Sequence, residues 1–209
     1  MKSRLALLLL ALLPWSVFAA QPAPEAGVDY VEIPGGKPYA PLAGKVEVVE
    51  LFGYTCIHCA HFQPTISAWQ KKQPAYVRFT PVPAAFGGYW MPYARAYYAA
   101  AKLRVLAKTH DIMFKALHED GSLPIQNASN QEIATFYQAY GADPAAFVAA
   151  MDSPATTLLL ERSTEFAVAS GIEGTPAIVV NGKYRVTARS PEDVLRVTDF
   201  LIAKERARK

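Results

Sequence analysis

The sequence predicts an α/β fold that carries a large, mainly helical insertion, and three observations support this. Residues 46–52, "VEVVELF", form a Val-rich apolar run typical of a buried strand. Helical spacing follows, because Phe62, Ile66 and Trp69 are separated by four and three residues and share one helical face. Residues 92–171 are almost wholly helical in character, and the stretch "TPAIVVNGKYRVTA" beyond them returns to an extended pattern.

The first nineteen residues have the layout of a secretory signal peptide. Lys2 and Arg4 precede the apolar run "LALLLLALL", and the small residues "VFA" at 17–19 offer a cleavage site. The apolar run is too short to span a bilayer. We therefore expect residues 1–19 to be removed and the rest to be a soluble protein exported to an oxidising compartment. Without the two basic residues the formal charge falls from +3 to +1, which gives no sign of a nucleic-acid partner.

The helical segment contains clear start signals. Ser129 followed by Glu132 has the spacing of a capping box, and Asp143 and Ser153 are each followed by a proline, as at many helix N-termini. A strand is expected at 77–80, just before a loop rich in Pro and Gly that leads into the helices. We expect four or five helices in this part of the chain.

The C-terminal part predicts a β-hairpin and a closing helix. The dipeptide Asn181-Gly182 is a strong signal for a two-residue hairpin turn, and it separates candidate strands at 177–180 and 183–187. The closing helix should begin after Ser190, a good N-cap residue that a proline follows.

Cys56 and Cys59 are the only cysteines of the chain, and they are separated by two residues at the predicted strand-to-helix turn. A thiol in the first turn of a helix meets unpaired backbone N–H groups and the positive end of the helix dipole, so the pKa of Cys56 should be low. His58, between the two cysteines, can add a hydrogen bond or a positive charge. Cys59, one turn further on, should be more buried and less ionised.

The chemistry expected of such a pair is thiol–disulfide exchange. A disulfide between Cys56 and Cys59 closes so short a loop that it would constrain the unfolded chain little, which makes a purely structural role a poor explanation. A substrate thiolate can instead attack Cys56, and the resulting mixed disulfide is released by a second thiol.

The order of elements and motifs resembles the DsbA family of periplasmic thiol:disulfide oxidoreductases. The resemblance is carried by "VVELF", "CIHC", the long helical segment and "GTPAIVVNGKY", and it covers nearly all of the chain beyond the signal peptide. It implies a thioredoxin fold whose thioredoxin-like domain comprises 20–63 and 172–209. The insertion, 64–171, would be mainly helical and would begin with the strand near 77–80.

The resemblance also implies a function and further site residues. The chain would be a disulfide-forming enzyme, a periplasmic oxidase that donates its Cys56–Cys59 disulfide to unfolded, newly secreted proteins and needs no metal or other cofactor. A cis peptide bond would join Thr175 to Pro176, where a substrate could pair as an added strand. Glu50 would be a buried acid that relays protons to Cys59, unless it simply faces solvent. A monomer is implied, reoxidised by a DsbB-type membrane protein that passes electrons to quinone.

Two other functions are compatible with parts of the sequence. A disulfide isomerase or reductase of the same superfamily is suggested by Thr175, although too few residues precede Val46 to form an N-terminal dimerisation domain. A metal-binding module could use Cys56, Cys59 and His61, but a zinc site needs four ligands and the sequence offers no further cysteine.

Overall fold

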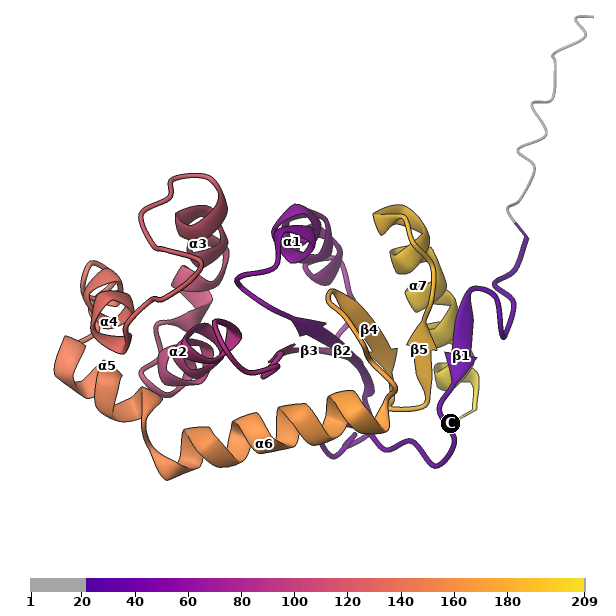
Figure 1. Ribbon diagram of the computed structural model, residues 1–209. Helices are drawn as coiled ribbons and strands as arrows, with labels where there is room; N and C mark the ends of the chain where they lie inside the picture. Colours follow the sequence, from indigo (N-terminus) through magenta and orange to yellow (C-terminus); the bar gives the residue numbers. More distant parts are fainter. Residues whose placement is uncertain (1–21, 209) are drawn as a thin grey trace, which may run out of the picture.

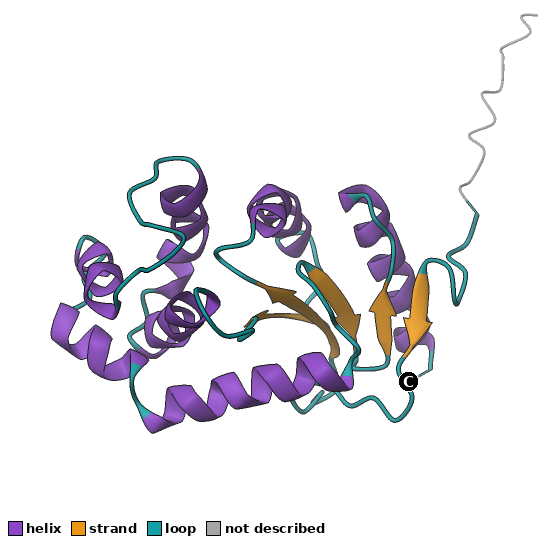
Figure 2. Ribbon diagram, in the orientation of Figure 1, coloured by secondary structure: helices purple, strands orange, loops and turns teal. Residues whose placement is uncertain are grey.

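The protein, described for residues 22–208 by a computed structural model, contains a central mixed sheet with helices on both faces (Figures 1 and 2). The predicted signal peptide, 1–19, lies outside the described residues. Within the described part the sheet has five strands in the order β1-β5-β4-β2-β3. The strands are β1 (Tyr30–Glu32), β2 (Val46–Phe52), β3 (Val77–Pro83), β4 (Ala177–Val180) and β5 (Tyr184–Val186).

Strand β2 is the centre of the sheet. It pairs in parallel with β3 and antiparallel with β4, so that Glu50 is opposite Pro81 on one side and Ile178 on the other. All seven residues of β2 are buried, as its continuous apolar run predicts. The predicted strands are thus confirmed, with β3 continuing three residues further and β5 one residue shorter at each end. The expected two-residue turn is wrong, because three residues, 181–183, connect β4 to β5.

Strand β1 was not predicted from the sequence. It has only three residues and pairs antiparallel with β5 at the edge of the sheet. Three residues are too few to show an alternation of apolar and polar side chains in the sequence. The segment is a strand because it pairs with the exposed edge of β5.

Two helices cover one face of the sheet and a third covers the other (Figure 1). On the first face lie α1 (Ile57–Gln70) and α7 (Pro191–Ala207), and on the second lies α6 (Pro154–Ala169). The expected apolar face of α1 is confirmed, because its buried residues include Phe62, Ile66 and Trp69. They share one core with Val197, Leu201 and Ile202 of α7.

Five helices connect β3 to β4, within the range expected. Besides α6 they are α2 (Trp90–Lys102), α3 (Leu106–His118), α4 (Asn130–Gln138) and α5 (Pro144–Met151). The predicted capping box is present: Ser129 Oγ accepts from the Glu132 N–H, and the Glu132 carboxylate accepts from the Ser129 N–H at 2.9 Å. The caps predicted at Asp143, Ser153 and Ser190 are also present.

The core of the helical part extends into the sheet domain at the position of the cysteines. Phe52, Tyr54 and Cys59 belong to the same buried cluster as residues from α2 to α5. The segment that carries both cysteines is therefore held from two sides. Among residues 22–208, no helix is both long enough and apolar enough to cross a membrane.

Candidate active site

Cys56 is the N-cap residue of α1, directly after the turn that follows β2. The Cys56 N–H donates to the carbonyl of Gly53 at 3.0 Å, which closes this turn. Both cysteines are present as thiols: Cys56 is partly exposed, whereas Cys59 is completely buried. The predicted difference in exposure is therefore present.

The surroundings of Cys56 favour its thiolate. Hydrogen bonding from the Cys59 thiol, together with smaller contributions from the Thr175 hydroxyl and the backbone N–H groups of Cys59 and His58, lowers the pKa of Cys56 to about 5. These contributions outweigh partial burial, which acts in the opposite direction. At neutral pH the reduced protein therefore holds Cys56 as an anion.

Cys59 has the opposite character. Burial, and next to it the neighbouring Cys56, raise the pKa of Cys59 far above that of an ordinary thiol, and the carboxyl of Glu50 adds to the increase. The Gly53 N–H donates to Cys59 Sγ at 3.4 Å. One sulfur of the pair is thus suited to attack and to leave, and the other to remain protonated.

His58 acts on Cys56 through its main chain in this structure. Its imidazole is exposed and makes no hydrogen bond to either sulfur within the described residues, whereas its backbone N–H lowers the pKa of Cys56. Stabilisation of the thiolate by the His58 side chain stays a prediction.

Thr175 and Pro176 lie against the cysteine pair, 119 residues further along the chain. Their peptide bond is cis, and the Cys56 thiol donates to the Thr175 carbonyl at 3.4 Å. The Thr175 hydroxyl is buried and has no hydrogen-bond partner among the described residues. It is therefore an available donor for the thiolate.

Glu50 is a buried carboxyl group without a partner. The residue is 1% exposed, and neither carboxyl oxygen makes a hydrogen bond to any of residues 22–208. Burial raises the pKa of Glu50 to about 8, so the group is mostly protonated at neutral pH. The alternative that Glu50 faces solvent is thus wrong, and a proton-carrying role stays a prediction.

Three residues that anchor the turn before Cys56 were not assigned a role from the sequence. The His118 ring donates from Nε2 to the Tyr54 carbonyl at 2.7 Å, and the Tyr54 hydroxyl bonds to His110 Nδ1 at 2.7 Å. Burial lowers the pKa of His110 to about 4, so that ring stays neutral. Both histidines come from α3, and no local pattern connects them to a turn 56 and 64 residues away.

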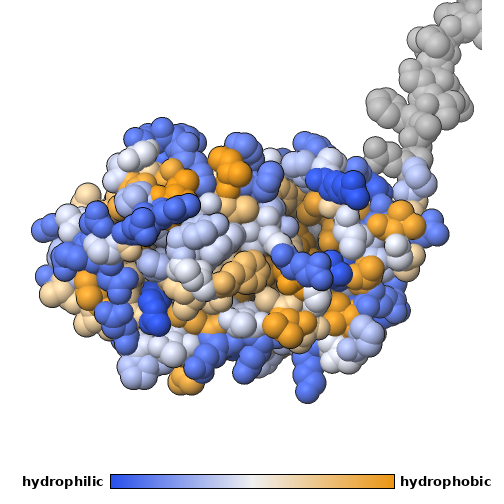
Figure 3. All heavy atoms as spheres, in the orientation of Figure 1, coloured by the Kyte–Doolittle hydropathy of each residue, from blue (hydrophilic) through white to orange (hydrophobic). Residues whose placement is uncertain are grey.

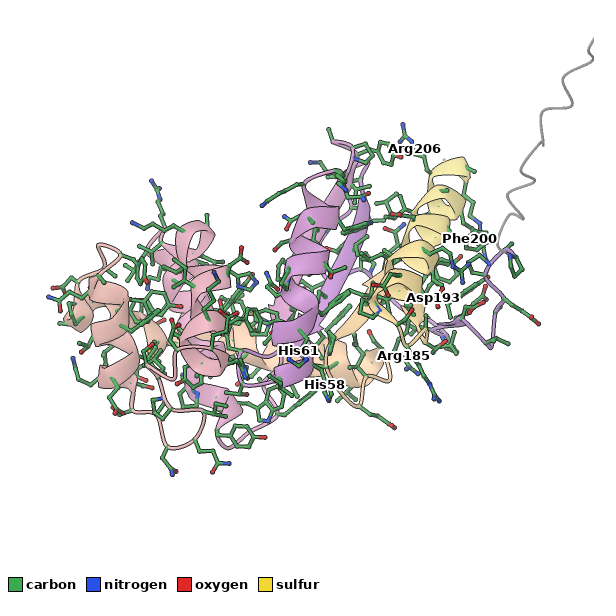
Figure 4. The ribbon with its side chains drawn as sticks, turned by 90° about the horizontal axis from the view of Figure 1, so that it is seen from above. His58, His61, Arg185, Asp193, Phe200 and Arg206 are labelled. Atoms are coloured by element: carbon green, nitrogen blue, oxygen red, sulfur yellow. The ribbon has the colours of Figure 1, made fainter. Side chains whose placement is uncertain are left out.

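A groove of about 600 Å³ lies beside Cys56, whose hydrogen-bond partner Thr175 is one of the lining residues. Its walls are the N-terminal end of α1 with His58 and His61, residues 172–178, β5 and the loop that leads to α7. In Figure 4 the two imidazoles lie at that end of α1, and Arg185 of β5 lies across from them. Within residues 22–208, no group of three or more His, Cys, Asp or Glu side chains is arranged to hold a metal ion.

Comparison with known proteins identifies relatives of the whole chain. Residues 90–197 match the family model described as a DSBA-like thioredoxin domain. The thiol:disulfide interchange protein DsbA of Azotobacter vinelandii is 41% identical over 88% of this chain and 85% of its own, and that of Pseudomonas aeruginosa PAO1 is 38% identical over 87% and 86%. A match that covers 87% or 88% of this chain extends over residues 56–59. The family model begins only at residue 90 and therefore does not include the two cysteines.

Solved structures agree with the sequence relatives. The crystal structure of the oxidoreductase DsbA from Xylella fastidiosa has a TM-score of 0.86 and 53% identity, and the match covers 88% of this chain and 98% of that one. The crystal structure of Pseudomonas aeruginosa DsbA has a TM-score of 0.80 and 38% identity, with 88% and 95% covered.

We expect Thr175→Val to raise the pKa of Cys56 above about 5, because valine keeps the shape of the side chain and removes the hydroxyl donor. Near that pH, alkylation of the reduced variant should be slower by up to roughly tenfold, since less thiolate is present. The measurement is the alkylation rate as a function of pH. Thr187→Val is the control, because Thr187 lines the same groove but donates to the Val28 carbonyl. A Cys56 pKa that stays the same in Thr175→Val would contradict this assignment.

A second prediction concerns Glu50→Gln in the oxidised protein, where no thiol titrates. Because the Glu50 pKa is about 8 in the fold and 4.5 for an ordinary Glu side chain, folding takes up a proton between these values. Stability from the neutral carboxyl is complete below pH 4.5 and is lost as the pH rises through 8. The free energy of unfolding of Glu50→Gln should therefore exceed that of the native protein by an amount that grows with pH, on the order of 1.4 kcal/mol per pH unit.

Denaturant unfolding at several pH values between 5 and 8 measures this difference. Glu47→Gln is the matched control: Glu47 is buried on the same strand but pairs with Arg78 at 2.8 Å, so its substitution should destabilise the fold across that range. Parallel pH profiles for Glu50→Gln and the native protein would rule out a raised Glu50 pKa.

Proposed function

Because the chain belongs to the DsbA family of thiol:disulfide oxidoreductases, we propose that it is the oxidase that donates a Cys56–Cys59 disulfide to unfolded, newly secreted proteins in the periplasm. The observation that carries this proposal is the contrast between the two sulfurs: the pKa of Cys56 is lowered to about 5, while that of buried Cys59 is raised. Such a pair favours its reduced form and therefore accepts electrons.

The reaction begins when a substrate thiolate attacks Cys56 Sγ of the disulfide. The bond between the two enzyme sulfurs breaks, a mixed disulfide forms, and Cys59 takes the electron pair and a proton. Glu50, neutral near pH 7 and buried below the pair, is suited to supply that proton.

A second substrate thiolate then attacks the substrate sulfur of the mixed disulfide, and Cys56 leaves as a thiolate. The substrate has lost two electrons and gained a disulfide, and the enzyme holds a Cys56 thiolate and a Cys59 thiol. The low pKa of Cys56 makes it a good leaving group, which drives this step toward the oxidised substrate.

The Thr175 carbonyl supports a role in binding the substrate backbone. It accepts a hydrogen bond from Cys56 only when Cys56 is a protonated thiol, so this bond is absent when Cys56 is a thiolate or is bonded to a substrate sulfur. The carbonyl is then available to a substrate N–H, so that the substrate adds a strand beside Thr175 and Pro176. Recognition of main chain accommodates many substrates.

The remaining parts of the proposal concern the chain as a whole. Residues 1–19 direct export, a DsbB-type membrane protein reoxidises the enzyme, and the enzyme acts as a monomer whose only redox group is the disulfide. The thioredoxin-like domain comprises 20–63 and 172–209, with the mainly helical insertion at 64–171. The parallel pairing of β3 with β2 supports an insertion that begins with a strand of the sheet.

The test of function compares two single-cysteine variants with a reduced, unfolded substrate protein. Cys56→Ser should abolish oxidation, because the attacked sulfur is gone. Cys59→Ser should accumulate mixed disulfides through Cys56, because no thiol of the enzyme can resolve them. Non-reducing electrophoresis and mass spectrometry report both outcomes. If the reduced native protein showed equal alkylation rates for its two thiols, the assigned roles would be wrong.

A further prediction follows from the pKa of Cys56. In the reduced protein the thiolate stabilises the fold fully above the ordinary thiol pKa of about 9, and this contribution disappears as the pH falls through about 5. The disulfide has no such thiolate. The oxidised protein should therefore melt below the reduced protein at pH 8, and the gap should narrow toward pH 5. The stability difference between the two redox forms should change by at most about 1.4 kcal/mol per pH unit. The change should be smaller than this limit, because solvent screens the partly exposed sulfur.

Calorimetry of both redox forms between pH 5 and pH 8 measures this gap. Cys56→Ser is the control, since it has neither the disulfide nor the low-pKa thiolate and should lack the reduced form's extra stability at pH 8. An oxidised form that is the more stable throughout would indicate a reductase or a structural disulfide.

A further inference from the structure

We propose that Arg185 forms an anion-binding subsite in the groove beside Cys56. The enzyme would then oxidise fastest those thiols that lie close to an acidic side chain in the substrate. This inference rests on the proposed oxidase function and specifies the substrates that the site prefers. It depends on the position of the Arg185 guanidinium and on the charges of the groove.

The arginines of the groove differ from most others in the described chain. Arg78, Arg196 and Arg208 form ion pairs, Arg95 donates to a carbonyl, and Arg162 and Arg206 lie over tyrosine rings. Arg185 and Arg189 both line the groove, and neither makes an ion pair or hydrogen bond among residues 22–208. Two unpaired guanidinium groups therefore face the same cavity.

Arg185 is the better placed of the two. It is partly buried on β5, between the buried residues Tyr184 and Val186, and its Nε is buried without a partner. The guanidinium lies about 4 Å from the position that a side chain at Gly171 would take, just beyond the C-terminal end of α6. The partial negative charge of that helix end makes the burial of a cation less costly. It supplies no carboxylate, so the outer donors of Arg185 remain available.

The acidic groups nearby do not neutralise the groove. Glu173 is the one carboxylate among its lining residues, and it is exposed and makes no ion pair in the described structure. Asp193 of α7 is bonded to Arg196 and does not line the groove. With two arginines and one glutamate, the groove has a net positive charge, and a carboxylate that enters it gains a partner whose fork-shaped donors suit it.

The groove leads from the arginine to the reacting sulfur. Thr175 and Pro176, which contact or adjoin Cys56, are lining residues of the same cavity, and Arg185 is the register partner of Val179 on the strand that starts just after Pro176. On the face shown in Figure 3, hydrophobic residues (orange) and hydrophilic residues (blue) are interspersed. The lining of the groove is mixed in the same way, because it combines the apolar residues Phe62, Ile178 and Val194 with the charged groups. A bound segment can thus place its cysteine at Cys56, apolar side chains in the groove and an acidic side chain at Arg185.

The experiment uses oxidised native protein and reduced two-cysteine peptides. One Asp is moved stepwise through the positions on either side of the first cysteine, and at each position a matched peptide carries Asn instead. An acidic neighbour also changes the thiolate fraction of the peptide. Each rate is therefore divided by the rate of the same peptide with hydroxyethyl disulfide, a small uncharged disulfide.

At one or two positions the normalised rate should be about fivefold higher for Asp than for Asn, the effect expected of a partly exposed ion pair. Arg185→Met should reduce this ratio to about one while the Asn peptides react as before, and Arg185→Lys should retain part of it. Arg104→Met is the matched control, because Arg104 also makes no ion pair or hydrogen bond within residues 22–208 but lines a different cavity, and it should keep the full ratio. Raising the ionic strength should lower the ratio in the native protein, which tests the proposal without any substitution.

A ratio near one at every position in the native protein, a ratio that salt does not change, or an equal ratio in Arg185→Met would overturn the subsite. If the Asn peptides are oxidised efficiently in these cases, the proposed oxidase function stands and only the subsite is rejected. If the native protein oxidises no peptide at all, the oxidase function is rejected, and the subsite with it.

Discussion

The site depends on one constraint, which is that a thiol occupies the N-cap of α1 where the buried central strand ends. Cys56 lies there because β2 is fixed between β3 and β4 and because the turn at residues 53–55 is held by hydrogen bonds from two histidines of α3. An N-cap side chain meets the unpaired N–H groups of the first helical turn, and these groups stabilise an anion. The low Cys56 pKa comes first from the Cys59 thiol and then from the Thr175 hydroxyl and the first-turn N–H groups, all of which this position brings next to the sulfur.

Folding shifts the pKa values of Cys56 and Glu50 in opposite directions, and neither group is paired with an opposite charge within the described residues. Folding releases a proton from Cys56, whose pKa is about 5, and takes up a proton at Glu50, whose pKa is about 8. In the reduced protein the two effects oppose each other between these values, so its stability should depend little on pH there. In the oxidised protein only the Glu50 effect remains. Because the Glu50 effect is common to both redox forms, it does not change the difference in stability between them, and the tendency to accept electrons depends on the Cys56 thiolate.

Elements with local signals could be predicted from the sequence, and features made by distant residues could not. The Asn181-Gly182 turn was predicted from its two residues and has positive φ at both, and the cap at Ser129 was predicted from a three-residue spacing. The Cys56 site was predicted because both cysteines lie in one turn of helix. The hydrogen bond between Tyr54 and His110 could not be predicted, because it depends on how α3 packs on the sheet. The unpaired state of Arg185 could not be predicted either, because it depends on which carboxylates the fold brings near its guanidinium group.

The site therefore combines two kinds of recognition with different energetic weight. The proposed pairing at the Thr175 carbonyl, which lies next to Cys56, would involve only the substrate main chain and would accept any flexible segment with a thiol. A carboxylate at Arg185 adds about 1 kcal/mol because the pair remains partly exposed to water. An increment of this size changes a rate several-fold but excludes no substrate. An enzyme that must oxidise many different chains can thus hold a preference among their cysteines, and so influence which disulfide forms first, without narrowing the set of proteins that it accepts.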